Sequence, residues 1–99
     1  MADVLVLGAA QKAASAKLRI PCDFGDMPLL IQGYNIATKT VTCSGSGAPT
    51  VSGVQLDYPY QVSCLLTGGT VGTYDITYTI VMDDPDATTY VGVGNIQIL

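Results

Sequence analysis

From residue 37 onward, hydrophobic and polar positions alternate with a period of two. The first such run places Ala37, Val41 and Cys43 on one face, opposite three threonines. Two later runs repeat the pattern, with Tyr60, Val62, Cys64 and Leu66 in one and Tyr74, Ile76, Tyr78, Ile80 and Met82 in the other. This period predicts half-buried β-strands whose apolar faces share one core.

Turn residues separate these runs and bound three further strands. We expect strands at 29–34, at 50–57 with an interruption at Gly53, and at 88–99. Val91 and Val93 differ in parity from Ile96 and Ile98, which predicts a bulge near 94–95. Six to seven short strands with a turn after each are typical of an all-β, immunoglobulin-like antiparallel β-sandwich. The likeness is architectural, because the chain has no Trp to pack on an inter-sheet disulfide.

Residues 1–20 do not follow this alternation. They hold six alanines and three of the four basic residues, and 9–18 has some helix propensity without a sound N-cap. We expect an N-terminal arm over 1–20, a linker over 21–28 between two prolines, and the sandwich over 29–99. Such an arm needs a surface to lie on. Its residues predicted to contact a partner are Leu5, Leu7, Lys12, Lys17, Leu18 and Arg19.

Composition argues against catalysis. The 99 residues are 48% hydrophobic and 12% charged, with no His and no Glu. The absence of His removes the commonest general base and the commonest metal ligand. We therefore expect a protein that is not an enzyme and has no cofactor.

Charge is distributed unevenly. Four basic residues and three Asp up to residue 39 give +1, whereas five Asp and no basic residue afterwards give −5. Binding to nucleic acid or to an anionic membrane needs clustered Lys and Arg, so neither is an expected partner. The acidic start and short apolar runs match neither a signal peptide nor a membrane span, so we expect synthesis in the cytosol.

Two groups of residues are candidates for contacts with a ligand or partner. Asp83, Asp84 and Asp86 form the one acidic cluster, interpreted either as a weak calcium site or as a solvated hairpin tip. Tyr58 and Tyr90 are candidate contact residues, because the other alternating tyrosines lie in core register.

Three cysteines, an odd number, exclude a fully paired framework within one chain. Two interpretations stay open. All three are buried small hydrophobic residues, or Cys43 and Cys64 form one disulfide.

The segment 62–80 (VSCLLTGGTVGTYDITYTI) contains a strand, a glycine turn and an alternating strand. It resembles small immunoglobulin-like virion proteins of tailed bacteriophages, and the similarity extends over about 29–99. The acidic turn at 83–88 departs from the short Ser-Ala-Gly-Arg-like turn of that family. Residues 1–20 also lack its usual N-terminal segment.

The resemblance implies a passive structural role in the virion. The first expectation is a tail or neck adaptor that links fibres to the tail through the ordered arm and the sandwich surface. The alternative is a capsid decoration (cement) protein, and a further one is a stand-alone module that binds glycans or a host surface. The implied partners are tail tube or nozzle, fibre or capsid proteins, with the chain present in the virion in multiple copies.

Overall fold

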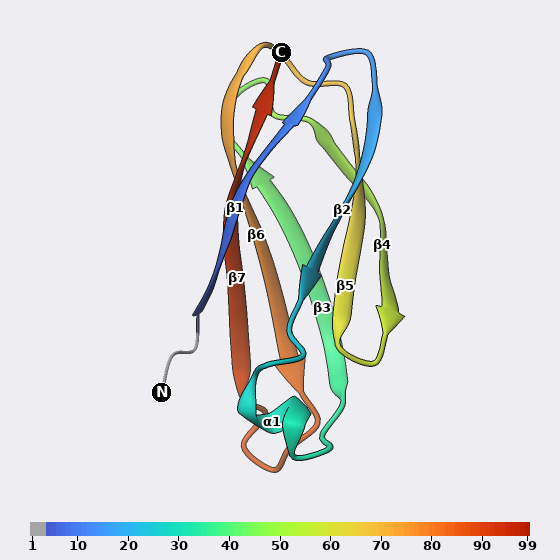
Figure 1. The fold of residues 1–99 in the computed structure, drawn as a ribbon, viewed down its shortest axis with the longest axis vertical. Coiled ribbons are helices and arrows are strands. Elements are labelled where there is room, and N and C mark those ends of the chain that lie inside the picture. Colours follow the sequence, from blue (N-terminus) through green and yellow to red (C-terminus); the bar gives the residue numbers. More distant parts are fainter. Residues whose placement is uncertain (1–3) are drawn as a thin grey trace.

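The computed structural model describes residues 4–99 and places seven strands and one short helix in that part of the chain (Figure 1). The elements are β1 (Val4–Lys12), β2 (Lys17–Asp23), α1 (Pro28–Ile31), β3 (Ile36–Ser44), β4 (Thr50–Tyr58), β5 (Gln61–Thr67), β6 (Gly72–Met82) and β7 (Thr89–Ile98).

Two sheets pack face to face. One has the strand order β1-β7-β6-β3 and the other β2-β5-β4. Every pair is antiparallel except β1 with β7, which is parallel. The molecule is elongated, 42 × 23 × 18 Å, with α1 capping one end of the sandwich. The predicted all-β sandwich of six to seven strands is thereby confirmed with seven strands, although one of its strand pairs is parallel.

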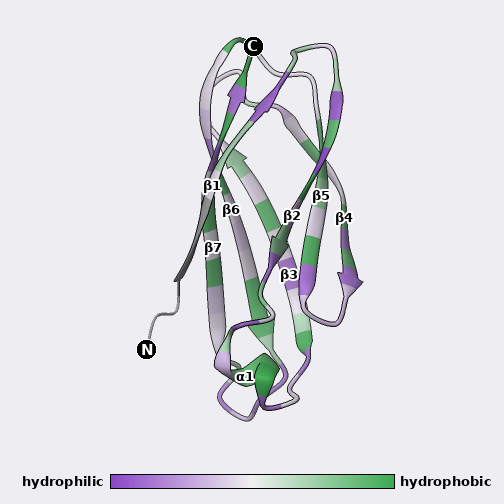
Figure 2. Cartoon of the chain, viewed as in Figure 1, coloured by the Kyte–Doolittle hydropathy of each residue, from purple (hydrophilic) through white to green (hydrophobic). Residues whose placement is uncertain are grey.

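The core lies between the sheets and follows the predicted alternation. β5 contributes Val62, Cys64 and Leu66, each fully buried. From the other sheet β6 contributes Ile76, Tyr78, Ile80 and Met82, each at most 2% exposed. Figure 2 shows apolar and polar bands alternating along these strands. Burying a large apolar side chain contributes about 1.5–3 kcal/mol, so these faces are the main source of stability.

The predicted arm and linker are wrong. Residues 4–12 and 17–23 are strands at the edges of the two sheets, where β1 pairs with β7 and β2 with β5. Leu18, Ile20 and Cys22 point toward the core, whereas Lys17 and Arg19 are exposed. That alternation was present in the sequence but was masked by the alanines before it and by Pro21. Proline is tolerated here because β2 is an edge strand. The predicted linker also supplies core side chains, Phe24 at 0% and Met27 at 7% exposed.

The predicted strand over 29–34 is also wrong, since α1 lies at its start. Pro28 occupies the first helical turn, where its missing N–H costs nothing. Leu29 and Leu30 then pack against the core at the end of the sandwich. No helix in residues 4–99 is long and apolar enough to cross a membrane.

The predicted bulge of β7 near 94–95 is absent, because β7 pairs with β6 without a register shift from Gly72 with Ile98 to Val81 with Thr89. The register shift at this level lies in the neighbouring β1, between Val6 and Ala9, opposite Val93 and Asn95. The inward positions of β7 are Tyr90, Gly92, Gly94, Ile96 and Ile98. Two glycines without side chains hid this alternation. Gly92 is required for close packing, since a Cβ there would lie 2.6 Å from the Cys22 sulfur.

Candidate interaction surface

Lys12 is buried, at 3% exposed, so its predicted role as a partner contact is wrong. Its Nζ donates to the carbonyl oxygens of Ala13 (2.8 Å), Ala14 (3.3 Å) and Gly68 (2.7 Å). The three donors of the ammonium thus meet three acceptors, which offsets its removal from water. Lys12 therefore ties the β1–β2 turn to the β5–β6 loop.

The other N-terminal residues that were predicted to contact a partner differ in the side of the sheet that they face. Leu18 is half-buried against the core, so it is not a surface contact, whereas Lys17 and Arg19 are exposed on the outer face of β2. Leu5 and Leu7 belong to β1, but their side chains lie outside the part of the chain that the structure describes.

Of the two tyrosines that were predicted to contact a partner, one is buried and the other is exposed. Tyr90 is 2% exposed, because it occupies an inward position of β7 opposite Ile80, and its predicted surface role is wrong. Tyr58 is 57% exposed. Tyr60, predicted to face the core, lies in the β4–β5 turn and is 38% exposed. The rings of Tyr58 and Tyr60 stack, with centroids 5.6 Å apart and planes 14° apart.

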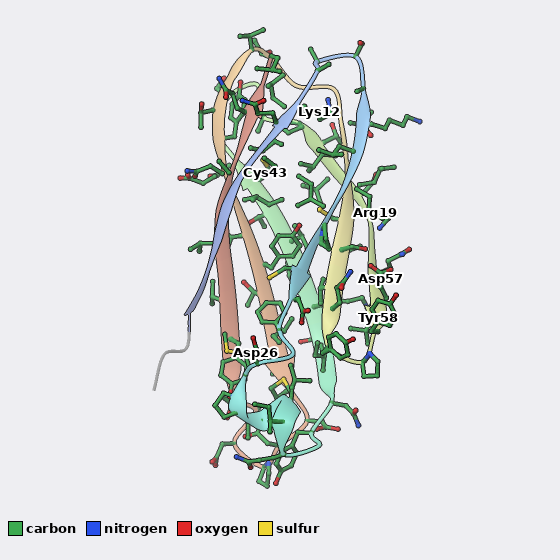
Figure 3. The ribbon with its side chains drawn as sticks, in the orientation of Figure 1. Lys12, Arg19, Asp26, Cys43, Asp57 and Tyr58 are labelled. Atoms are coloured by element: carbon green, nitrogen blue, oxygen red, sulfur yellow. The ribbon has the colours of Figure 1, made fainter. Side chains whose placement is uncertain are left out.

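A β-bulge places a carboxylate beside this aromatic pair. Leu56 pairs with Val62 and Tyr58 with Gln61, so Asp57 is an extra residue in β4. Bulges re-aim side chains at sheet edges, and Asp57 lies near Tyr58 along this edge of the molecule (Figure 3). Asp57 was missed from the sequence. Its one signal, the Asp-Tyr-Pro-Tyr turn, does not reveal the bulge.

Polar side chains from all three strands of this sheet surround Asp57. Hydrogen bonds from Ser63 and Gln55, and the nearby charge of Arg19, lower the pKa of the Asp57 carboxyl, and it is ionised at neutral pH. Arg19 Nη1 in turn donates to Ser63 Oγ (2.9 Å) and to the Gly53 carbonyl (3.1 Å). The outer face of β2, β5 and β4 therefore carries an ordered polar network next to exposed aromatic rings.

The acidic cluster of the β6–β7 loop stabilises the loop backbone. Asp83 Oδ1 accepts from the Asn35 backbone N–H (2.8 Å), and Asp84 accepts from the backbone N–H and hydroxyl of Thr88 (2.8 and 2.6 Å). The hydrogen bond from Thr88 lowers the pKa of Asp84. Within residues 4–99 no three side chains of His, Cys, Asp or Glu converge to hold a metal, Asp83, Asp84 and Asp86 included. The candidate calcium site is therefore not assembled.

All three cysteines are free thiols, with Cys22 and Cys64 buried and Cys43 half-buried. Burial, with a smaller contribution from neighbouring Asp23, raises the pKa of Cys22 to about 12. Burial also raises the pKa of Cys43 and of Cys64. This arrangement matches the first interpretation, in which the thiols act as small core side chains, and contains no Cys43–Cys64 disulfide.

The four edge strands of the two sheets differ in how well they are protected against pairing with a strand of another chain. β1 has a register shift between Val6 and Ala9, and β2 contains Pro21. β4 has two register shifts, one of them next to Gly53, whose φ is 56°. β3 has one register shift at its start, between Ile36 and Thr38, and then pairs with β6 without interruption from Thr38 to Ser44. Prolines, bulges and charges block strand pairing at an edge, so β3 is the least protected of the four.

Comparisons with known proteins show a similarity of fold only. No protein-family model matches the chain, and no curated protein matches it. Among solved structures, an endo-fucoidan hydrolase of glycoside hydrolase family 107 is similar with a TM-score of 0.57 at 13% identity. The match covers 99% of this chain but 13% of the hydrolase chain. PbICP-C, solved in complex with falcipain-2, is similar with a TM-score of 0.55 at 12% identity, over 97% of this chain and 89% of that one. At such identities the similarity shows a shared sandwich fold.

Proposed function

We propose that this chain is a non-enzymatic structural protein of a tailed-bacteriophage virion, an adaptor at the tail or neck that docks a neighbouring virion protein. The resemblance of 62–80 to that family supports the proposal. This segment forms β5, the glycine turn and most of β6, which are central strands of both sheets. The observation that carries the docking role is the edge of β3 from Thr38 to Ser44, which has no register shift and no proline.

The partner segment that fits β3 is an extended strand. In an antiparallel pair, alternate backbone N–H and C=O groups of an edge strand point away from its neighbour. β3 has β6 as its one strand partner in the described chain, so its other side offers these groups to an incoming strand. The exposed side chains of β3 include Thr38, Thr40 and Thr42, and Lys39 is its one charged residue. Little charge must be desolvated on docking.

This docking route replaces the predicted arm. Residues 4–12 pair with β7 and residues 17–23 pair with β5, so these two strands are not free to lie along another subunit. The adaptor therefore contacts its partner with the folded sandwich. Repetition of the contact around a symmetric particle compensates for weak single contacts.

Copy number in purified particles tests the location. Quantitative mass spectrometry against the major capsid protein is expected to give about a dozen copies, or another small multiple of the tail symmetry. Hundreds of copies would instead favour the capsid decoration alternative. Absence from particles would overturn both virion roles and leave the stand-alone binding module.

The double variant Thr40→Lys/Thr42→Lys tests the docking edge. Both residues are exposed, so the variant is expected to fold and to melt like the natural chain, while the added charges block strand pairing. We expect it to be lost from particles. The matched control, Thr73→Lys/Thr89→Lys, changes exposed threonines on β6 and β7 and is expected to be incorporated normally. Normal incorporation of the β3 variant would refute docking at this edge.

A further inference from the structure

The stacked tyrosines form a fixed platform at the end of β4. A Cβ on Gly25 would lie 3.3 and 3.5 Å from ring atoms of Tyr60, so this ring packs directly on the Gly25 backbone. The carbonyl of Tyr60 accepts a hydrogen bond from the Phe24 N–H at 2.8 Å. Tyr60 is therefore held between the Gly25 backbone and the ring of Tyr58. The more exposed Tyr58 ring is held in place by this stack, which lowers the entropy that a bound ligand would cost.

Hydrogen-bonding groups lie next to that ring. The ionised Asp57, which is the extra residue of the bulge, directly precedes Tyr58 in the chain, and the Gln55 amide donates to it. Gln61 is the residue opposite Tyr58 on β5, and it also hydrogen-bonds to Asp57. Carboxylate and amide groups accept from and donate to hydroxyl groups. Figure 3 shows Asp57 next to Tyr58, and the hydrogen bonds to Asp57 place the two glutamine amides beside this exposed aromatic ring.

We propose that this surface, formed by Tyr58, Tyr60, Asp57, Gln55 and Gln61, binds a neutral glycan. The C–H groups on one face of a pyranose ring carry partial positive charge and pack against the negative face of an aromatic ring. Its hydroxyl groups then meet the carboxylate and the amides. Because the site lies at an exposed end of a strand, it can bind a segment of a longer glycan whose other sugar residues extend past it in both directions.

The charge of the site selects against acidic sugars. Asp57 is ionised, and the chain has a net charge of −4. The positive group nearest to it, Arg19, already donates to Ser63 and to the Gly53 carbonyl. A uronate or sulfate group would therefore meet repulsion without a free cation to offset it. The bulges of β4 also make an incoming protein strand a poor occupant of this edge.

Titration of the ¹⁵N-labelled full chain with maltohexaose, cellohexaose, chitohexaose and mannohexaose tests the proposal, with an alginate hexamer as the acidic probe. At least one neutral hexasaccharide is expected to shift the amide signals of residues 55–61 with a Kd in the micromolar-to-millimolar range, while the alginate hexamer does not. Absence of binding by all four neutral probes would overturn the proposal. Shifts confined to another face would do the same.

Variants locate the contact. Tyr58→Ala is expected to weaken binding about tenfold or more, while Tyr58→Phe, which keeps the ring, changes it by less than about threefold. Asp57→Asn keeps the shape of the side chain, removes its charge and is expected to let the alginate hexamer bind. Val71→Ala changes another exposed apolar residue, in the β5–β6 loop, and is the matched control. Unchanged affinity in Tyr58→Ala would refute the glycan platform.

The outcome is independent of the docking role of β3, since the platform lies on the other sheet. A Tyr58→Ala chain that binds no glycan yet assembles into particles supports the proposal. A natural chain that binds no glycan while Tyr58→Ala is lost from particles would instead identify this surface as a protein contact, and the proposal would be wrong.

Discussion

Gly92 of β7 packs closely against Cys22 of the facing sheet, and Gly92→Ala tests this close packing. The residue lies at an inward position of β7, opposite Tyr78 of β6. A Cβ there would lie 2.6 Å from Cys22 Sγ and 3.4 Å from Cζ of Phe24. Both neighbours are fully buried: Cys22 belongs to β2 of the other sheet, and Phe24 follows that strand. Gly92 has no positive φ, so the cost of alanine is steric.

The size of the effect follows from this overlap. Nonbonded heavy atoms prefer roughly 3.5–4.0 Å, so the sulfur or the strand must move by about 1 Å. Overpacking a filled core costs about 1–3 kcal/mol, and the full burial of Cys22 places Gly92→Ala in the upper part of that range, at about 2–3 kcal/mol. Cys22→Ala removes the clashing sulfur and alone costs about 1–2 kcal/mol. The double variant is therefore expected to lose about 1–2 kcal/mol, well below the sum of the single variants.

Urea unfolding followed by far-UV circular dichroism and tyrosine fluorescence measures these free energies, since the chain has six Tyr and no Trp. The slope with denaturant should be the same for all four proteins. A Gly92→Ala chain within about 0.5 kcal/mol of the natural one would show that the sheets do not approach as described. Additive losses in the double variant would refute the pairing of Gly92 with Cys22.

Three further predictions concern buried polar groups. Lys12→Met removes three hydrogen bonds and is expected to lower the free energy of unfolding by about 2–4 kcal/mol. The control Lys17→Met, at an exposed position, is expected to change it by less than about 0.5 kcal/mol, and equal effects of the two variants in urea unfolding would contradict the burial of Lys12. Tyr78→Phe leaves a backbone carbonyl without its donor and is expected to cost about 1–2 kcal/mol by the same assay, and a neutral effect would argue against that bond. At pH 8 the native chain is expected to react with a thiol reagent faster at Cys43 than at Cys22, because burial raises the pKa of Cys22 to about 12 and keeps the thiol protonated. Mass spectrometry measures the labelling of each cysteine over time, and rapid labelling of Cys22 would contradict its burial.

Local patterns predicted well the strands whose two faces differ clearly. The alternation from Tyr74 to Met82 identified β6, and that from Tyr60 to Leu66 identified β5 within one residue at each end. The patterns were less informative where a side chain was missing from the alternation. Gly92 and Gly94 hid the inward positions of β7, and the resulting parity slip was misread as a bulge.

The candidate surface was predicted only in part. Tyr58 was identified because it follows a predicted strand without entering the core alternation, and it is exposed. Tyr90 has the same amino-acid type but faces inward, because the register of β7 against β6 decides its side. Asp57 joins the surface through a bulge, which depends on the pairing of β4 with β5 and leaves no periodic signal along the chain.

The sequence by itself determined the fold class, because a period of two over a weakly charged, threonine-rich chain leaves two packed sheets as the way to bury its apolar faces. It also determined the position of most turns. The tertiary structure decided where 4–23 belongs, which edge of each sheet it closes and that Lys12 ends among three carbonyl oxygens. The physical reason is that alternation along one strand indicates which of its side chains share a face, whereas the strand with which it pairs and the register of that pairing depend on residues far away in the chain.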